Sequence, residues 1–185
     1  MDKDKIKEGV RLILEGVGED LNREGLIDTP SRVARMYEEI FEGLHKKSAD
    51  EINAFFTVEE NNRVIVKDIE FYSMCEHHLL PFYGKAHVAY IPSEKKVTGL
   101  SKIARLVTMA SKKPQLQEKM TEEIKKGLEE KISCEGVLVV VEGEHMCMTM
   151  RGIKSKGSTT VTIGASGVFK ENISLRDETL RLMGM

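Results

Sequence analysis

Two short stretches of the sequence hold most of the side chains that could bind a metal ion or transfer protons. The first, residues 74–81 (MCEHHLLP), places a thiol, a carboxylate and two adjacent imidazoles next to one another. The whole chain has only 5 His and 3 Cys among 185 residues, so these groups are concentrated here. Because burying such polar groups without a partner is costly, the concentration predicts a bound ion or ligand.

The second stretch, residues 144–152 (EHMCMTMRG), alternates polar side chains with methionines. Side chains on a strand point alternately to the two faces of a sheet, so the pattern predicts a strand with one chemical face and one core face. The core face would hold the three methionines, which fill irregular gaps well. The chemical face would hold His145, Cys147, Thr149 and Arg151.

A zinc site can be assembled from these two stretches. Cys75 and His78 are three positions apart, which suits one ion in a tight turn, and Cys147 could supply a third ligand. Three protein ligands leave a fourth position for water, as in catalytic zinc sites. His77 or His145 could instead complete the coordination, so spacing alone leaves a closed structural site open.

A third stretch, residues 99–107 (GLSKIARLV), is a candidate anion site. Ser101 is the expected N-cap of a helix, and Lys102 and Arg105 follow near its start. Free N–H groups and the helix dipole attract anions at such a position. Arg151 beside the predicted metal face and Arg32 near the start of another helix favour this interpretation over a solvated helix face.

The N-terminal part of the chain is expected to form two amphipathic helices. Apolar residues recur at helical spacing between positions 6 and 17, and again between positions 33 and 41. In the second helix Thr29 is the expected N-cap, and Pro30 suits the first helical position.

Further along the chain, strands and helices are both expected. Strands are predicted over residues 63–73, 84–92, 136–143, 144–152 and 158–169. The third and fourth of these would turn at Gly143. Helices are predicted over residues 101–112 and 116–132, and a short one from Ser174. The helix over 116–132 is expected to bury Leu116, Met120, Ile124 and Leu128.

Strands mostly follow strands directly, which favours an antiparallel sheet with helices packed on one face, an α+β fold. We expect an N-terminal helical segment over residues 1–60 and the sheet domain over residues 61–185, together forming one continuous unit. Hydrophobic residues make up 41% of the chain and charged residues 31%, as in ordinary globular proteins.

The composition also limits the partners and the compartment. A net charge of −2 gives no global attraction to nucleic acid. No apolar run approaches the roughly 20 residues of a membrane helix, and the charged N-terminus lacks a signal-peptide core, so we expect a cytoplasmic protein. Three cysteines make a poor disulfide framework, and Cys134 is the expected bystander among them.

Six stretches together resemble GTP cyclohydrolase I of the zinc-dependent type. They are residues 28–37 (DTPSRVARMY), 74–92 (MCEHHLLPFYGKAHVAYIP), 99–107, 115–124 (QLQEKMTEEI), 145–153 (HMCMTMRGI) and 167–171 (GVFKE). The resemblance runs from about Gly25 to the C-terminus. Its departures are modest: Lys113 and Pro114 stand where the family often has Arg-Leu, and Lys119 stands where Arg is common.

The resemblance implies a reaction and an assembly. The family hydrolyses GTP, expels carbon eight of guanine as formate, rearranges the ribose and recloses to dihydroneopterin triphosphate, a step of pterin and tetrahydrofolate synthesis. Its tunnelling fold joins the sheets of neighbouring subunits edge to edge into a barrel. Two such rings stack into a homodecamer whose active sites lie between subunits.

The resemblance also implies roles for particular residues. One Zn²⁺ per subunit would be held by Cys75, His78 and Cys147. His145 would act as a general acid at the ring nitrogen beside carbon eight, and His77 at the ribose ring oxygen. The guanine-reading carboxylate would be Glu118, with Gln117 beside it. The ribose and triphosphate contacts would be Ser101, Lys102, Arg105, Arg151 and, from a neighbouring subunit, Arg32.

Two other functions stay open on the sequence alone. One is a tunnelling-fold cyclohydrolase that stops at a ring-opened product. The other is a zinc-stabilised nucleotide-binding module without turnover. In such a module four protein ligands would complete the zinc coordination, and His77 would have no role.

Overall fold

The computed structural model describes all residues, 1–185, and the chain divides into two compact units, Met1–Glu42 and Gly43–Met185. The first unit holds the two helices expected there, α1 (Lys3–Gly16) and α2 (Thr29–Ile40). Thr29 is the first residue of α2 and Asp28 precedes it, so the prediction that Thr29 is the N-cap is wrong by one position. The Thr29 hydroxyl instead donates a hydrogen bond to the Gly25 carbonyl at 3.3 Å.

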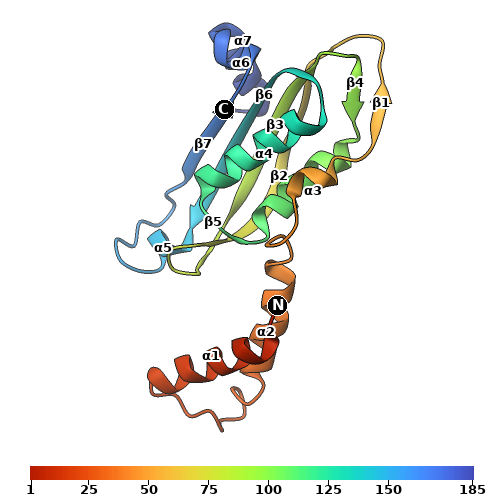
Figure 1. Cartoon of the computed structure of the whole chain (residues 1–185). Helices are drawn as coiled ribbons and strands as arrows, with labels where there is room; N and C mark the ends of the chain where they lie inside the picture. The colour runs from red at the N-terminus through yellow and green to blue at the C-terminus, as the bar shows by residue number, and fades with distance from the viewer. The chain divides into compact units, whose positions relative to one another are not determined.

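The second unit is built on a five-stranded sheet in the order β5-β2-β3-β6-β7 (Figure 1). Every neighbouring pair is antiparallel except β2 and β5. The strands are β2 (Val64–Cys75), β3 (Pro81–Pro92), β5 (Pro114–Gln115), β6 (Cys134–His145) and β7 (Thr160–Ala165). A separate small sheet pairs β1 (Phe55–Thr57) with β4 (Lys96–Thr98), and the short 3₁₀ helix η1 (Ser48–Glu51) precedes it.

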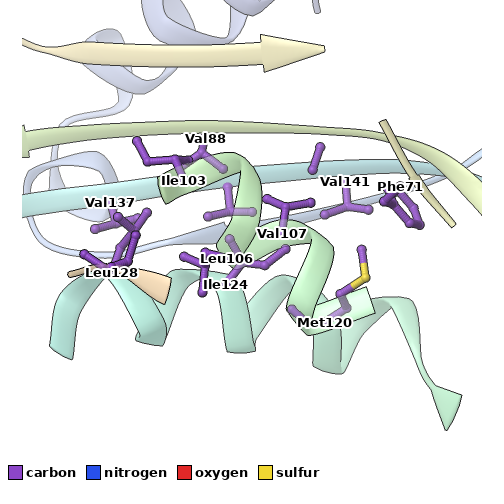
Figure 2. Packing of buried hydrophobic residues seen from close by; sticks show 14 of the residues in the cluster. Phe71, Val88, Ile103, Leu106, Val107, Met120, Ile124, Leu128, Val137 and Val141 are labelled. Carbon is purple, nitrogen blue, oxygen red and sulfur yellow. The ribbon is translucent and has the colours of Figure 1, made fainter. Parts of the chain in front are cut away.

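Two long helices, α3 (Leu100–Ser111) and α4 (Gln117–Lys131), cover one face of the large sheet. Figure 2 shows aliphatic side chains of both helices meeting those of the sheet. Met120, Ile124 and Leu128 have no exposed surface, which confirms their predicted burial, whereas Leu116 precedes α4 and is partly buried. Burial of one such side chain stabilises the fold by about 1.5–3 kcal/mol, so this face is the main core.

The opposite face of the sheet has a smaller core at one end. Side chains of β3 and β6 pack there against α6 (Val168–Glu171) and α7 (Ile173–Met183). The alternation along β6 explains both cores, because Val137, Val139 and Val141 face α3 and α4 while Leu138 and Val140 face the other way. The predicted α+β class and antiparallel sheet are therefore confirmed.

The predicted turn at Gly143 is wrong. β6 continues through Gly143, which pairs with Gly84 of β3 and Thr160 of β7, and it ends at His145. The following residues form one helical turn, α5 (Met146–Thr149), and not a strand.

As a result the methionines of this stretch do not form a core face. Met148 and Met150 are 36% and 56% exposed. Ser101 is likewise not the N-cap of α3, because that position belongs to Gly99. None of the helices combines the length and the apolar character that a membrane span requires.

Candidate active site

The chemical side chains gather at the end of the sheet where β2 and β6 both finish. These two strands flank the start of β3, since Phe82 pairs with Ser73 on one side and with His145 on the other. Cys75 is the last residue of β2 and His145 the last residue of β6. The strand register therefore brings the two sequence stretches together although they are about 70 residues apart.

The side chains of Cys75 and Cys147 lie near each other, because Cys147 packs against the buried cluster that contains Cys75. Cys75 is buried at the start of a tight turn, where its N–H donates to the Leu80 carbonyl and its carbonyl accepts from the Leu79 N–H, both at 2.9 Å. Leu79 closes this turn with a positive φ of 50°. Burial, followed by the proximity of Cys75, raises the pKa of the Cys147 thiol, and the nearby Arg151 opposes that shift.

His78 comes from the same turn, and its Nε2 lies 3.1 Å from Nη1 of Arg151. A guanidinium can only donate, so Nε2 accepts this bond and the ring proton is on Nδ1. No three His, Cys, Asp or Glu side chains are arranged as a group that could hold a metal ion. The chemistry of the donor set still fits zinc, because two thiols lie near each other and an imidazole follows three residues after one of them, its Nε2 lone pair facing a guanidinium that could move away.

His145 is held by two contacts. Its ring stacks on Phe82, with centroids 4.6 Å apart and planes 2° from parallel, and its Nε2 lies 2.8 Å from Oε1 of Gln117. Burial lowers the pKa of His145, and the charge of the nearby Glu118 carboxylate opposes that shift. His145 and Glu118 are therefore neighbours at this end of the sheet.

Carboxylates on this side of the molecule differ in their partners. Glu118 lies in the first turn of α4 and is exposed. Both carboxylate oxygens of Glu76 accept from Lys119 Nζ, at 3.0 and 3.3 Å. Lys119, which stands where the family commonly has Arg, therefore forms an ion pair with Glu76. His77 is exposed, and its ring stands edge-on to that of His78 with 6.4 Å between centroids.

The predicted anion-binding residues of α3 are not part of this cluster. The last residue of α3, Ser111, is near the cluster, since its carbonyl accepts from Ser73 at 2.7 Å. α3 begins just after Thr98, and the Thr98 N–H donates to the hydroxyl of Tyr90. Tyr90 in turn pairs with Val64, the first residue of β2. Ser101, Lys102 and Arg105 thus lie towards the other end of β2 from Cys75.

Arg32 belongs to the first unit, where it pairs with Asp28 at 3.6 Å. Within the second unit, the structure brings Gln117, Glu118 and Arg151 together with the cysteines and histidines.

Two features of the site were not predicted from the sequence. Phe82 is the platform for His145, and no local pattern distinguishes it from any other core aromatic. The hydrogen bond between Gln117 and His145 was also not predicted, although the glycine at position 143 could have indicated that a side chain passes close to the strand there. A Cβ at Gly143 would lie 2.6 Å from Gln117 Oε1, so this side chain crosses the strand only where there is no Cβ.

An antiparallel sheet backed by two long helices, with thiols, imidazoles and a carboxylate gathered at one end, is the arrangement of an α+β enzyme. A family model described as GTP cyclohydrolase I matches residues 6–184.

Curated relatives named GTP cyclohydrolase 1 include those of Carboxydothermus hydrogenoformans, Clostridium perfringens and Streptococcus gordonii. The first is 57% identical and covers 100% of this chain and 96% of its own length. The second is 57% identical and covers 100% of both, and the third is 58% identical and covers 98% and 97%.

The solved structure of the archaeosine synthase QueF-Like in its apo form is 18% identical, with a TM-score of 0.45 over 57% of this chain and 93% of that chain. On the family model and the curated relatives, the chain belongs to the GTP cyclohydrolase I family. Its fold is accordingly the tunnelling fold, as the resemblance predicted.

Proposed function

We propose a mechanism and an assembly for the reaction that membership of this family assigns. The chain is a hydrolase of the GTP cyclohydrolase type and acts in pterin synthesis. The proposal concerns its metal, its catalytic residues and its subunit arrangement, with formate and dihydroneopterin triphosphate as products.

Cys75, His78 and Cys147 would hold one Zn²⁺. The proximity of the two thiols is the single observation that supports this most strongly, because thiolates brought together from distant elements are ligands that zinc prefers. When bound, zinc would lower the pKa of a water molecule and supply a nucleophile for carbon eight of guanine at neutral pH. Arg151 would then leave the lone pair of His78 Nε2 and be available to an anionic group.

His145 would give a proton to the ring nitrogen beside carbon eight, which makes that carbon a better electrophile. His77, exposed in the same turn as His78, would act at the ribose ring oxygen. Glu118 would accept hydrogen bonds from the ring N–H and the exocyclic amine of guanine. Adenine offers no such pair of donors, so ATP would leave this carboxylate without partners. The exposure of Glu118 and its proximity to His145 support this role.

The triphosphate would be bound by Ser101, Lys102, Arg105, Arg151 and Arg32. One chain does not present all five beside the cysteines, because α3 begins towards the opposite end of β2. That separation supports active sites shared between subunits of a homodecamer. Exposed apolar side chains of α1 and its C-cap, such as Ile13 and Val17 at 66% and 76% exposure, also suit an assembled protein. The three free cysteines agree with the cytoplasm as the compartment.

One assay separates this proposal from its alternatives. Purified protein is loaded with Zn²⁺, its metal content and mass are measured, and it is incubated with GTP. Formate together with an oxidisable, fluorescent pterin supports the full reaction. Formate without the pterin indicates a cyclohydrolase that stops after ring opening, and neither product with bound zinc indicates a binding module.

A further inference from the structure

The side chain of Gln117 is bonded entirely within the protein. It is 1% exposed, and its Nε2 contacts the carbonyls of Val141 and Thr160 at 2.9 and 3.0 Å and the Thr162 hydroxyl at 3.1 Å. Two carbonyl oxygens can only accept, so the amide nitrogen must face them. The orientation of the amide group is therefore determined by the backbone of β6 and β7.

This orientation leaves Oε1 of Gln117 facing Nε2 of His145 at 2.8 Å. An amide oxygen can only accept, so Nε2 of His145 must carry a hydrogen. The proton on the imidazole is thereby assigned through the hydrogen-bond network, as tautomers in proteins have to be.

The other ring nitrogen of His145, Nδ1, has no hydrogen-bond partner in the protein. No buried side-chain nitrogen or oxygen of the chain lacks a partner. His145 is only half-buried, so its Nδ1 is open to solvent or to a ligand. The stack on Phe82 holds the plane of the ring in which both nitrogens lie.

We propose that Gln117 is a positioning residue: its amide oxygen holds the hydrogen on Nε2 of His145, so that Nδ1 is the ring atom that takes up a proton from solvent and then gives it to the substrate. The proton transfer through Nδ1 rests on the proposed function, whereas the assignment of the tautomer does not. It replaces the expectation that Gln117 contacts the substrate, because every polar atom of its side chain already has a partner within the protein.

The tautomer is measured directly by NMR. The full-length protein is prepared with ¹⁵N-labelled histidine, and the ring signals of His145 are assigned by their loss in a His145→Gln variant. We expect the wild-type protein, without substrate, to show a protonated Nε2 and a bare Nδ1 near neutral pH. A protonated Nδ1 with a bare Nε2 would overturn the proposal whatever the enzyme does with GTP.

Two substitutions test the role of the amide oxygen. Gln117→Met removes the acceptor, so Nδ1–H should become populated in the ring signals of His145. Burial against two carbonyls should keep the new carboxyl of Gln117→Glu protonated, so that one oxygen donates to a carbonyl in place of Nε2 and the other still accepts from His145. This variant should therefore retain the Nε2–H form. An unchanged tautomer in a folded Gln117→Met protein would refute the assignment. If that variant fails to fold, a Gln117→Glu protein that loses the Nε2–H form would do the same.

Kinetics separate a positioning residue from a substrate contact. Gln117→Met should lower kcat about 10- to 100-fold, as loss of an outer partner does, with little change in KM for GTP. A rise in KM with kcat unchanged would mean that Gln117 binds the substrate, contrary to the proposal. If wild-type protein shows the expected tautomer but does not turn over GTP, the proposed function fails and the tautomer assignment survives.

Thr162→Val is the matched control. The Thr162 hydroxyl contacts the same amide nitrogen at 3.1 Å but does not contact His145. Its loss disturbs the packing around Gln117 and leaves the bond from His145 Nε2 to Oε1 in place, so the tautomer should stay as in the wild type. A Thr162→Val protein with the Gln117→Met spectrum would show that general disturbance, and not the amide oxygen, sets the tautomer.

Discussion

Gly143→Ala should cost both stability and activity, because the new methyl group would meet the amide oxygen that orients His145. A Cβ on Gly143 would lie 2.6 Å from Gln117 Oε1, whereas ordinary contacts begin near 3.4 Å, so the oxygen must move by about 0.8 Å. The oxygen and nitrogen of this amide are held by bonds of 2.8 to 3.1 Å, and such a movement breaks at least one of them.

The expected loss in the free energy of unfolding has two parts. A broken hydrogen bond costs about 0.5–1.5 kcal/mol, and overpacking of a close-packed site typically adds about 1–3 kcal/mol. Urea denaturation of Gly143→Ala should therefore give a destabilisation of about 2–4 kcal/mol, accompanied by a lower kcat with GTP. The matched control is Gly164→Ala on β7, where a Cβ meets side-chain atoms at 3.3 Å or more and the cost should stay below about 1 kcal/mol.

A double-mutant cycle decides whether the clash is with Gln117. In a Gln117→Ala background the obstructing oxygen is absent, so Gly143→Ala should cost at least about 1 kcal/mol less than in the wild type. Equal costs in the two backgrounds would refute the structural reasoning, since they would trace the loss to the backbone of β6.

Three further predictions concern single side chains. Glu118→Gln should lower kcat/KM for GTP by about 10- to 100-fold and reduce the preference over ATP, with zinc content unchanged; an unaltered preference would remove its assigned role. His145→Ala should keep stoichiometric zinc but lower formate release by about 10²- to 10⁴-fold, and loss of zinc would make this histidine a ligand instead. Burial raises the pKa of the Cys134 thiol from 9.0 to about 12. The thiolate at pH 8 is thus about 1,000-fold scarcer than in an ordinary thiol, and iodoacetamide labelling, followed by mass spectrometry, should be slow and should quicken as pH rises; labelling as fast as in the urea-unfolded chain would contradict this.

Much of the fold was predictable because its elements carry their own periodicity. Strands β2 and β3 and helices α1, α3 and α4 were expected within a few residues of their observed bounds. The buried stripe Met120, Ile124 and Leu128 follows from helical spacing alone, since these positions fall on one side of α4.

The stretch after Gly143 was predicted wrongly because its alternation is a local pattern, whereas a strand needs a partner. β6 pairs with β3 as far as His145 opposite Phe82, and the residue before Phe82, Pro81, is the first of β3. On the other side β7 supplies its last pairing at Gly143. Opposite Met146, β3 therefore offers only Pro81, which has no N–H to donate, and β7 offers no residue, so the chain turns into α5.

The types of group available for chemistry can be read from the residues alone: two thiols and an imidazole with the spacing of zinc ligands, two further imidazoles and a carboxylate. Which of these groups meet depends on how the chain folds. Strand register brings Cys75 to Cys147 and places the start of α3 far from both. It also directs Gln117 inward, to backbone carbonyls of two strands and to His145. These outcomes depend on pairing between segments far apart in the chain, and no local pattern of residues encodes that pairing.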